Sequence, residues 1–377
     1  MKAIRYPTNP EERGRLKQRY VIALESLRNP NGTSKLRQAQ KDWKKIRRHL
    51  PEGSRFPSDI RKILRAEYPK LVAYYTCYVN MQPQGLLYLK ELQKIFSYET
   101  YHDAIAGFFM DDKNGFNLSV CHYCGAAYIN KYTVKKDDSE GLYRINNVTN
   151  AAELQKILRI RNLNNLRLIY NNIPYNTVEE FNRIVKFRCR DKFHSVFPEQ
   201  VKNHFDLDHV LDKGNCPITA LSLMNFVPSC SVCNEKLKKS KVLGRYGKPI
   251  EELSPTSKNF DFDNQVTFWL IPEAEAKLDK RPTDNQDDYE LEMAVDNPDY
   301  NIFIEMFHLR ERYGFHKMEA LFWLELKLRY PDSRIEMMAN SLNDPSYSAQ
   351  RIKDDIFQRV LDQRERCFEK LKRDILK

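Results

Sequence analysis

The chain has 377 residues, a formal net charge of +11 and a mean hydropathy of −0.67. This length suits two or three domains. No apolar run is long enough to cross a bilayer, which argues against a membrane partner. Residues 1–5 lack the apolar stretch of a secretory signal, so we expect a cytoplasmic protein.

The positive charge is concentrated near the start of the chain. Residues 1–75 contain 19 Lys and Arg against 7 Asp and Glu. A basic segment of this kind favours polyanionic partners, most often nucleic acid, through contacts to the phosphate backbone. The alternative is an ordinary solvated basic surface.

The first hundred residues have the apolar spacing of helices. We predict helices over residues 11–30, 33–49 and 83–98, and a further helix, from Ile60 to about Tyr68, that Ser58-Asp59 caps. Asn29-Pro30-Asn31-Gly32 is a turn signal between the first two. The beginning of the chain is therefore predicted to be helical and basic.

The centre of the chain combines strand and helix patterns. We predict strands over residues 205–210 and 226–228, and a helix that Ser231 caps. Residues 150–203 are expected to be a polar, mainly helical insertion. These patterns indicate an α+β protein.

The remainder of the chain is predicted to be mostly helical. We expect a strand near residues 260–271, a loop over 278–300, and helices over the ranges 302–313, 316–330, 332–342 and 348–377. Three regions result: a basic helical region (1–105), a central core with the insertion (106–245), and a mainly helical region (246–377). An apolar stripe in the last region is a candidate docking surface for a partner, and ordinary core packing is the alternative.

Two CxxC pairs supply four thiols. Cys121 and Cys124 form the first pair, and Cys230 and Cys233 form the second, more than 100 residues later. Zinc prefers thiolate ligands in a tetrahedron, and without an export signal the cysteines are expected to be reduced. We therefore predict a structural Zn²⁺ site that joins two distant segments. A redox motif, or simple core cysteines, is the alternative. The isolated thiols are read as buried residues: Cys77, Cys189, Cys216 and Cys367. His122, inside the first pair, is read as a polar surface residue.

Polar residues that suit hydrolysis lie beside the second pair. A neutral imidazole, as His209 offers, can take a proton from water near pH 7, and oxygen ligands suit Mg²⁺ or Mn²⁺. Asp208 and His209 are adjacent on a predicted strand, so their side chains point to opposite faces unless the strand ends or twists there. Asn234 directly follows Cys233, so a metal at the cysteines would fix its position.

The string Asp208-His209, then Asn225, then Cys230-x-x-Cys233-Asn234 resembles the motif of HNH endonucleases, the ββα-metal or His-Me finger class. The resemblance implies a ββα core held by the four-cysteine zinc site. It also implies that His209 is the general base, that Asn225 braces the loop and orients His209, and that Asp208 and Asn234 hold a catalytic Mg²⁺ or Mn²⁺. Asp206 is an alternative metal ligand. The basic residues expected to contact nucleic acid are Lys213, Lys236 and Lys238.

The stretch from Leu207 to Lys241 is also similar to HNH effectors of bacterial anti-phage defence systems, of the Septu and retron-associated types. A second segment, residues 309–317, carries a weaker similarity to the same proteins. The resemblance implies an effector that acts beside an ATPase, with DNA as the expected substrate and RNA as the alternative. The competing hypothesis is a zinc-stapled module that binds nucleic acid, or a partner, without cutting.

Overall fold

The computed structural model describes residues 1–81, 84–116, 118–134, 200–273, 281–342, 344, 346–357 and 366–377. Residues 1–130 and 204–377 form one compact unit, and residues 131–203 form a second. The region boundaries predicted at residues 105 and 245 both fall inside the first unit. Apart from residues 200–203, the predicted insertion (150–203) lies outside the described residues.

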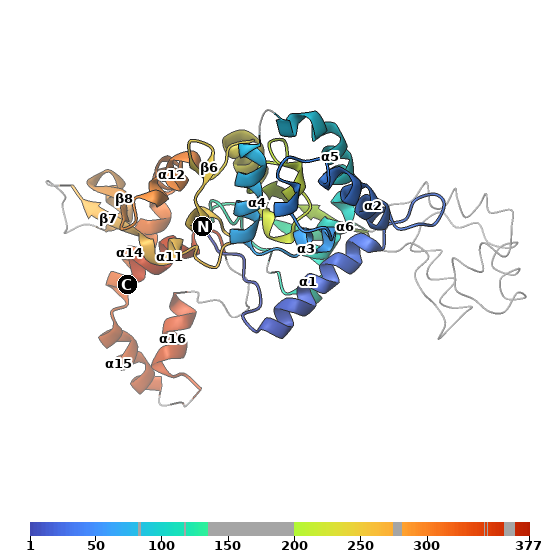
Figure 1. Cartoon of the computed structure of the whole chain (residues 1–377). Helices are drawn as coiled ribbons and strands as arrows, with labels where there is room; N and C mark the ends of the chain where they lie inside the picture. Colours follow the sequence, from blue (N-terminus) through green and yellow to red (C-terminus); the bar gives the residue numbers. More distant parts are fainter. Residues whose placement is uncertain are drawn as a thin grey trace, which may run out of the picture. The chain divides into compact units, whose positions relative to one another are not determined.

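Helices dominate the first part of the chain, as predicted (Figure 1). They are α1 (Pro10–Glu25), α2 (Lys35–Arg47), α3 (Ile60–Leu64), α4 (Tyr68–Asn80), α5 (Leu89–Ile95) and α6 (Tyr98–Met110). Side-chain caps begin α1, α3 and α6. Asn9 accepts hydrogen bonds from the amides of Glu11 and Glu12, and Pro10 occupies the first helical position. The predicted cap at Asp59 is confirmed, because its side chain accepts a hydrogen bond from the Arg61 amide.

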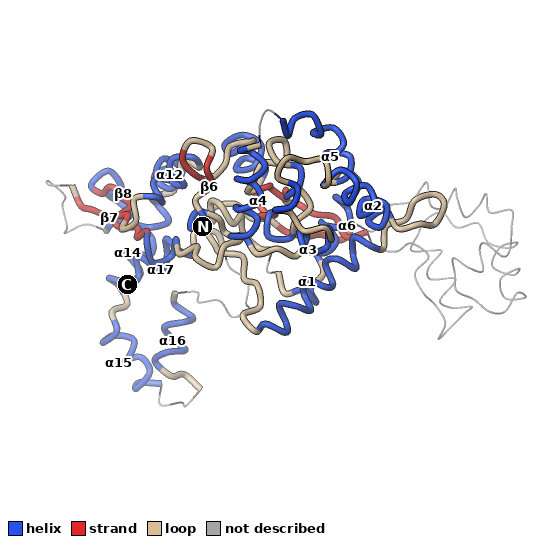
Figure 2. The backbone as a smooth tube through the Cα atoms, viewed as in Figure 1, coloured by secondary structure: helices blue, strands red, loops and turns tan. Residues whose placement is uncertain are grey.

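The strands are short and form two-stranded antiparallel sheets among the helices (Figure 2). The pairs are β1 (Asn130–Val134) with β2 (Gln200–His204), β3 (Asp206–His209) with β4 (Phe226–Ser229), β5 (Gly244–Arg245) with β6 (Lys248–Pro249), and β7 (Val266–Pro272) with β8 (Tyr289–Val295). In the β3–β4 pair, His209 lies opposite Phe226 and Asp206 opposite Ser229. The predicted α+β class is therefore confirmed.

The last part of the chain is again helical. Its elements are α11 (Phe262–Gln265), α12 (Asp299–Met306), α13 (Leu309–Phe315), α14 (Lys317–Arg329), α15 (Asp332–Leu342), α16 (Ala349–Ile356) and α17 (Glu369–Leu376). Buried side chains from α1 through α14, and from α17, belong to one continuous apolar cluster. A small satellite cluster of Ile335, Ile352 and Phe357 joins α15 to α16. None of the helices described here has the long apolar run that crossing a membrane would need.

Five local predictions are wrong. The strand predicted near residues 260–271 begins only at Val266, because Phe262–Gln265 forms α11. The helix predicted over residues 302–313 is broken at His308, which has a φ of 48°. Residues 289–295 are a strand rather than a loop, because Tyr289 and Met293 pack inward from β8 against β7. The helix predicted over residues 348–377 does not run unbroken, since Phe368 has a φ of 61° just before α17 begins. Ser231 makes no capping hydrogen bond, and the segment it precedes, Val232–Lys238, is a π-helix.

Candidate metal and catalytic site

The four cysteines of the two CxxC pairs come together. Their sulfurs lie within 4.8 Å of one another, although the pairs are separated by more than 100 residues. A tetrahedral zinc with Zn–S bonds of about 2.3 Å needs sulfurs about 3.8 Å apart. The four donors therefore fit a metal ion such as Zn²⁺, and the prediction that they form one cluster is confirmed.

Tight turns hold the two pairs in place. In the first pair the amide of Gly125 donates to the carbonyl of Cys121 over 2.9 Å. Gly125 has a φ of 63°, and a Cβ there would lie 2.7 Å from the nitrogen of Met1, so glycine is required at this position. In the second pair the amide of Asn234 donates to the carbonyl of Cys230 over 3.1 Å. Each CxxC is thus a closed turn that directs both sulfurs to one point.

A cation lies directly against the sulfur cluster. Nη1 of Arg312, on α13, donates a hydrogen bond to Sγ of Cys233 over 3.3 Å. The neighbouring Tyr313 hydroxyl donates to the carbonyl of Cys124 over 2.7 Å. Hydrogen bonding, first of all from Cys121, lowers the pKa of Cys230 to about 7. Four thiolates around a divalent ion carry a net charge of −2, which the guanidinium partly offsets. Sequence reasoning missed Arg312, because nothing in the local pattern relates α13 to the cysteines.

The other sulfur and imidazole residues are accounted for separately. Cys77 and Cys216 are buried and Cys367 is half-buried, none of them within the four-sulfur cluster. Cys189 lies outside the described residues. His122 is buried rather than at the surface, and its Nδ1 lies 3.0 Å from the carbonyl oxygen of Lys2. Burial lowers the pKa of His122 to about 3, so the ring is neutral at pH 7.

Asp208 is buried within a network of polar groups. Its carboxylate accepts a hydrogen bond from the hydroxyl of Tyr123, which lies between the two cysteines of the first pair. Nζ of Lys238, at the end of the π-helix, lies 3.1 Å from the carboxylate. Burial raises the pKa of the Asp208 carboxyl, while Lys238 and Tyr123 act in the opposite direction. Residues from both CxxC segments therefore hold this carboxylate.

His209 lies in an aromatic environment. Its ring contacts Tyr98 and Phe226 edge-on, with centroids 4.7 and 4.9 Å away. Nε2 lies 3.0 Å from the carbonyl oxygen of Ala220, and a carbonyl can only accept, so Nε2 carries the proton. Nδ1 is then the basic nitrogen. Burial lowers the pKa of His209 to about 3, which keeps the imidazole neutral at pH 7.

Asn225 organises the loop that contacts His209. Its side-chain oxygen accepts from the Leu211 amide over 2.7 Å, and its amide group donates to the carbonyls of Leu211 and Thr219 over 3.0 and 3.1 Å. Ala220, whose carbonyl binds His209, directly follows Thr219. The fully buried Asn225 therefore fixes the segment that sets the orientation of the imidazole.

The predicted ligands of a catalytic divalent cation are Asp208, on β3, and Asn234, in the π-helix. Asp208 and His209 contact different neighbours, as alternation along a strand requires. Within the described part of the chain, no hydrogen bond joins either side chain to Asn234, which is half-buried. The donor types suit Mg²⁺, but the Asp208 carboxylate is already bound by Tyr123 and Lys238.

Among the described residues, one buried carboxylate oxygen of Asp206 has no hydrogen-bond partner. The same is true of the Ser229 hydroxyl, which belongs to the residue opposite Asp206 across the β3–β4 pair. Unpaired buried oxygens are uncommon and need an explanation. Asp206 therefore stays open as an alternative metal ligand.

The three lysines predicted to contact nucleic acid differ sharply. Lys236 is exposed. Lys213 is half-buried; it pairs with Glu99 over 2.9 Å and lies 4.5 Å from the centre of the Tyr98 ring. For Lys238 the prediction is wrong, because its side chain is fully buried and its ammonium also donates to the carbonyl of His209 over 2.7 Å. Lys238 belongs to the polar network of Asp208.

Comparison with known proteins gives no match to a family model, to a curated protein or to a solved structure. The function of the chain must therefore be argued from its own residues.

Proposed function

We propose that the chain is a metal-dependent HNH-type endonuclease that hydrolyses phosphodiester bonds of nucleic acid, with DNA as the preferred substrate. The observation that carries the proposal is the state of His209. Nε2 donates to a backbone carbonyl, so Nδ1 is the nitrogen that would accept a proton from water. Burial lowers the pKa of His209 to about 3, which weakens it as a base, so the tautomer and not the pKa supports the proposal.

Two further features support the proposal. Two antiparallel strands, β3 and β4, are followed by a helical segment that begins at the second CxxC pair, an order of elements consistent with a ββα core. Asn225 makes the hydrogen bonds that a loop brace needs. Four thiolates that hold Zn²⁺ would stabilise this small core, since metal binding contributes directly to folding.

A catalytic Mg²⁺ or Mn²⁺ would neutralise charge that develops on the phosphate. Asp208 and Asn234 would hold it, with Asp206 as the alternative. Lys238 would first have to leave Asp208, because its ammonium lies 3.1 Å from that carboxylate. The cation and Lys238 therefore compete for one carboxylate.

Plasmid nicking tests the proposal. Protein loaded with zinc is incubated with supercoiled plasmid and Mg²⁺ or Mn²⁺, and His209→Ala is compared with the exposed His204→Ala. Loss of a general base costs about 10²–10⁴-fold in rate. We expect that loss for His209→Ala and none for His204→Ala. Equal nicking by both variants would remove His209 from the reaction.

A non-catalytic, zinc-stapled binding protein is the second candidate. The observation that favours it is burial: Asp208 is 3% exposed and His209 is 8% exposed. On this reading the polar network only stabilises the core. Full binding of nucleic acid without metal-dependent nicking, by wild type and His209→Ala alike, would support it. A role beside an ATPase in anti-phage defence rests on the sequence resemblance alone, and co-elution with such a partner in gel filtration would support it.

A further inference from the structure

The outward face of α2 is strongly basic. Five residues lie within an arc of about 100° when placed at 100° per residue, opposite the buried side chains of Leu36, Ala39 and Trp43. All five are exposed, and we call them the α2 basic stripe: Arg37, Lys41, Lys44, Lys45 and Arg48. No acidic residue lies within this arc, because Asp42 faces away from it, where Gln38 donates to its carboxylate over 3.1 Å.

The stripe differs from the other basic residues of the same region. Arg13 and Lys17 both pair with Glu67, and Arg61 pairs with Glu25. No ion pair or hydrogen bond involves a side chain of the stripe within the described ranges of the chain. Five like charges on one helix face repel one another and destabilise the helix. Their accumulation is therefore better explained by an anionic partner than by the fold.

The length of the stripe suits a nucleic-acid backbone. Eleven residues separate Arg37 from Arg48, which is about 16 Å along a helix. One strand of a duplex carries a charge about every 3.4 Å along its axis, or about five charges over that length. The number of cations thus matches the number of phosphates that the helix can lie beside.

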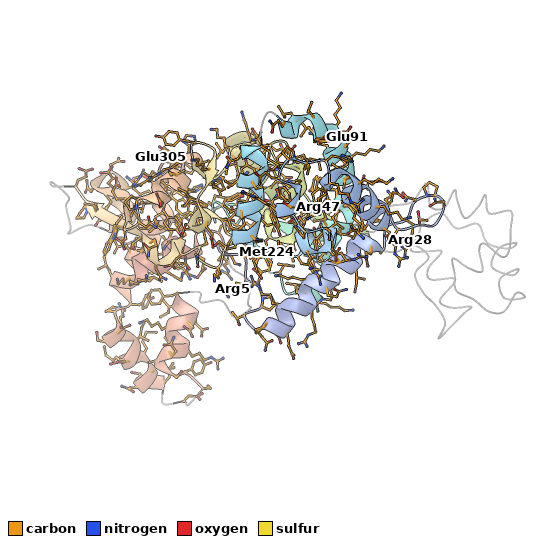
Figure 3. All side chains as sticks on the ribbon, in the orientation of Figure 1. Arg5, Arg28, Arg47, Glu91, Met224 and Glu305 are labelled. Carbon is orange, nitrogen blue, oxygen red and sulfur yellow. The ribbon has the colours of Figure 1, made fainter. Side chains whose placement is uncertain are left out.

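Basic residues also lie on the neighbouring helix α5. Helix α2 packs against α5, whose exposed Lys90 and Lys94 add two more cations. A groove of about 570 Å³ lies between α2 and α5. Lys45 is the stripe residue at its edge, and Lys94 lines it together with the acidic Asp42 and Glu91. Figure 3 labels Arg47 on α2 and Glu91 on α5, the two helices that border it.

Helix α5 also connects this basic surface to His209. It contacts the short turn Pro217–Thr219, which directly precedes Ala220, the partner of His209 Nε2. Helix α5 therefore contacts both α2 and the buried segment that orients the imidazole.

We propose that the α2 basic stripe binds the phosphodiester backbone of nucleic acid and is the main electrostatic contact to the substrate. The inference rests on the proposed function for the identity of the substrate, but not for the binding itself. Backbone contacts of this kind position a nucleic acid without reading its sequence.

Salt-dependent binding tests the inference. Fluorescence anisotropy with a labelled 20-base-pair DNA duplex compares wild type, Lys41→Gln/Lys44→Gln and the control Lys248→Gln/Lys258→Gln. Both variants lose two exposed charges, and the control residues lie outside α2. Each lost phosphate contact reduces the slope of log K against log salt by about 0.9. We expect the stripe variant to lose about 2 units of slope and at least 10-fold in affinity, and the control to match wild type.

The outcomes separate this inference from the proposed function. If the stripe and control variants lose the same affinity, only net charge matters and the inference is overturned. The same holds if the stripe variant loses binding to phosphatidylserine vesicles but keeps its binding to duplexes. An RNA duplex in the same assay identifies the preferred polymer, and weakened binding of either duplex supports the inference.

Cleavage is measured in parallel. If wild type never nicks plasmid but the stripe variant loses affinity for the duplex, the proposed nuclease activity is refuted and the inference about the stripe is supported. If wild type nicks plasmid but the stripe variant keeps the wild-type salt slope, the nuclease activity is supported and the inference is overturned.

Discussion

The four-cysteine cluster and the Asp208–His209 pair are both buried, yet they depend on their surroundings in different ways. The cysteines supply all four donors themselves, in two closed turns, and a divalent ion between them would satisfy every sulfur. Asp208 and His209 rely on partners from other segments: Tyr123, Lys238 and Ala220. The cluster would therefore be stabilised by a bound metal, whereas the pair depends on the packed fold.

The difference has an energetic reason. A buried carboxylate or imidazole loses its hydration, and only correctly placed neighbours compensate for that loss. Thiolates around a metal ion are compensated by the ion itself, so their neighbours matter less. Changes to the cysteines should thus act through metal binding, and changes near Asp208 through packing and hydrogen bonding.

The largest effect is expected from Cys233→Ser. A serine hydroxyl is a poor zinc ligand, and loss of a structural metal is among the changes that cost more than about 4–5 kcal/mol. We expect loss of bound zinc and a greatly lowered Tm, measured by elemental analysis and thermal unfolding with and without added zinc. Cys216→Ser, at a buried cysteine outside the cluster, is the control and should keep its metal. Full zinc content in Cys233→Ser would contradict the four-thiolate site.

The second-largest loss of stability is expected from Lys238→Met, with the zinc content unchanged. Removing one partner of a buried ion pair costs about 3–5 kcal/mol, because the other charge stays buried and uncompensated. The exposed neighbour Lys236→Met should change stability by less than about 0.5 kcal/mol. Urea unfolding at pH 7 measures both. If the two variants had equal midpoints, Lys238 would not compensate Asp208.

Tyr123→Phe isolates the contact that joins the two regions. The change keeps the ring, which stacks on Phe307 with centroids 4.4 Å apart, and removes only the hydroxyl that donates to Asp208. A buried acceptor left without its donor costs about 1–3 kcal/mol. Unfolding should show this loss with zinc content unchanged. Tyr246→Phe, at a fully exposed tyrosine, is the control and should have no effect.

The smallest effect is expected far from both regions, at Glu67. Burial alone would raise the pKa of this carboxyl, but hydrogen bonds from Arg13 and Lys17 outweigh it and lower the pKa to about 2. The stabilisation is therefore present above the unfolded pKa of about 4.3 and is lost as the pH falls toward 2. Glu67 is 44% exposed, so screening limits its contribution to about 1 kcal/mol or less. Urea midpoints of Glu67→Gln should fall slightly below wild type at pH 7 and meet it near pH 2. A constant difference at every pH would exclude this ion pair as its cause.

The sequence predicted much of the fold because local signals carry it. Helices α1, α2 and α15 begin and end within a few residues of their predicted bounds, since apolar spacing and turn residues mark them. Strands β3 and β4 lie where alternation and composition placed them. Strand β8 was missed although Tyr289, Leu291 and Met293 alternate, because the acidic residues between them led us to predict a loop.

The site could be predicted where residue type and spacing alone indicate the chemistry. Cysteines at CxxC spacing indicate a metal whatever surrounds them, so the cluster could be predicted. The burial of Lys238 and the contact of Arg312 with Cys233 depend on how distant segments pack, and no local pattern encodes that. From sequence alone, a lysine near a candidate nuclease motif, such as Lys238, is predicted to be exposed and to contact nucleic acid.

The first CxxC turn also contacts segments that are synthesised much later in translation. Its partners include Tyr313, which binds the Cys124 carbonyl, and Phe368, whose amide donates to the Gly125 carbonyl over 2.9 Å. Phe368 follows Cys233 by 135 residues. At about 5–20 residues per second of synthesis, that distance takes roughly 7–27 s. All four thiols therefore leave the ribosome well before Phe368, and a metal ion would have this interval in which to enter the site before that segment covers it.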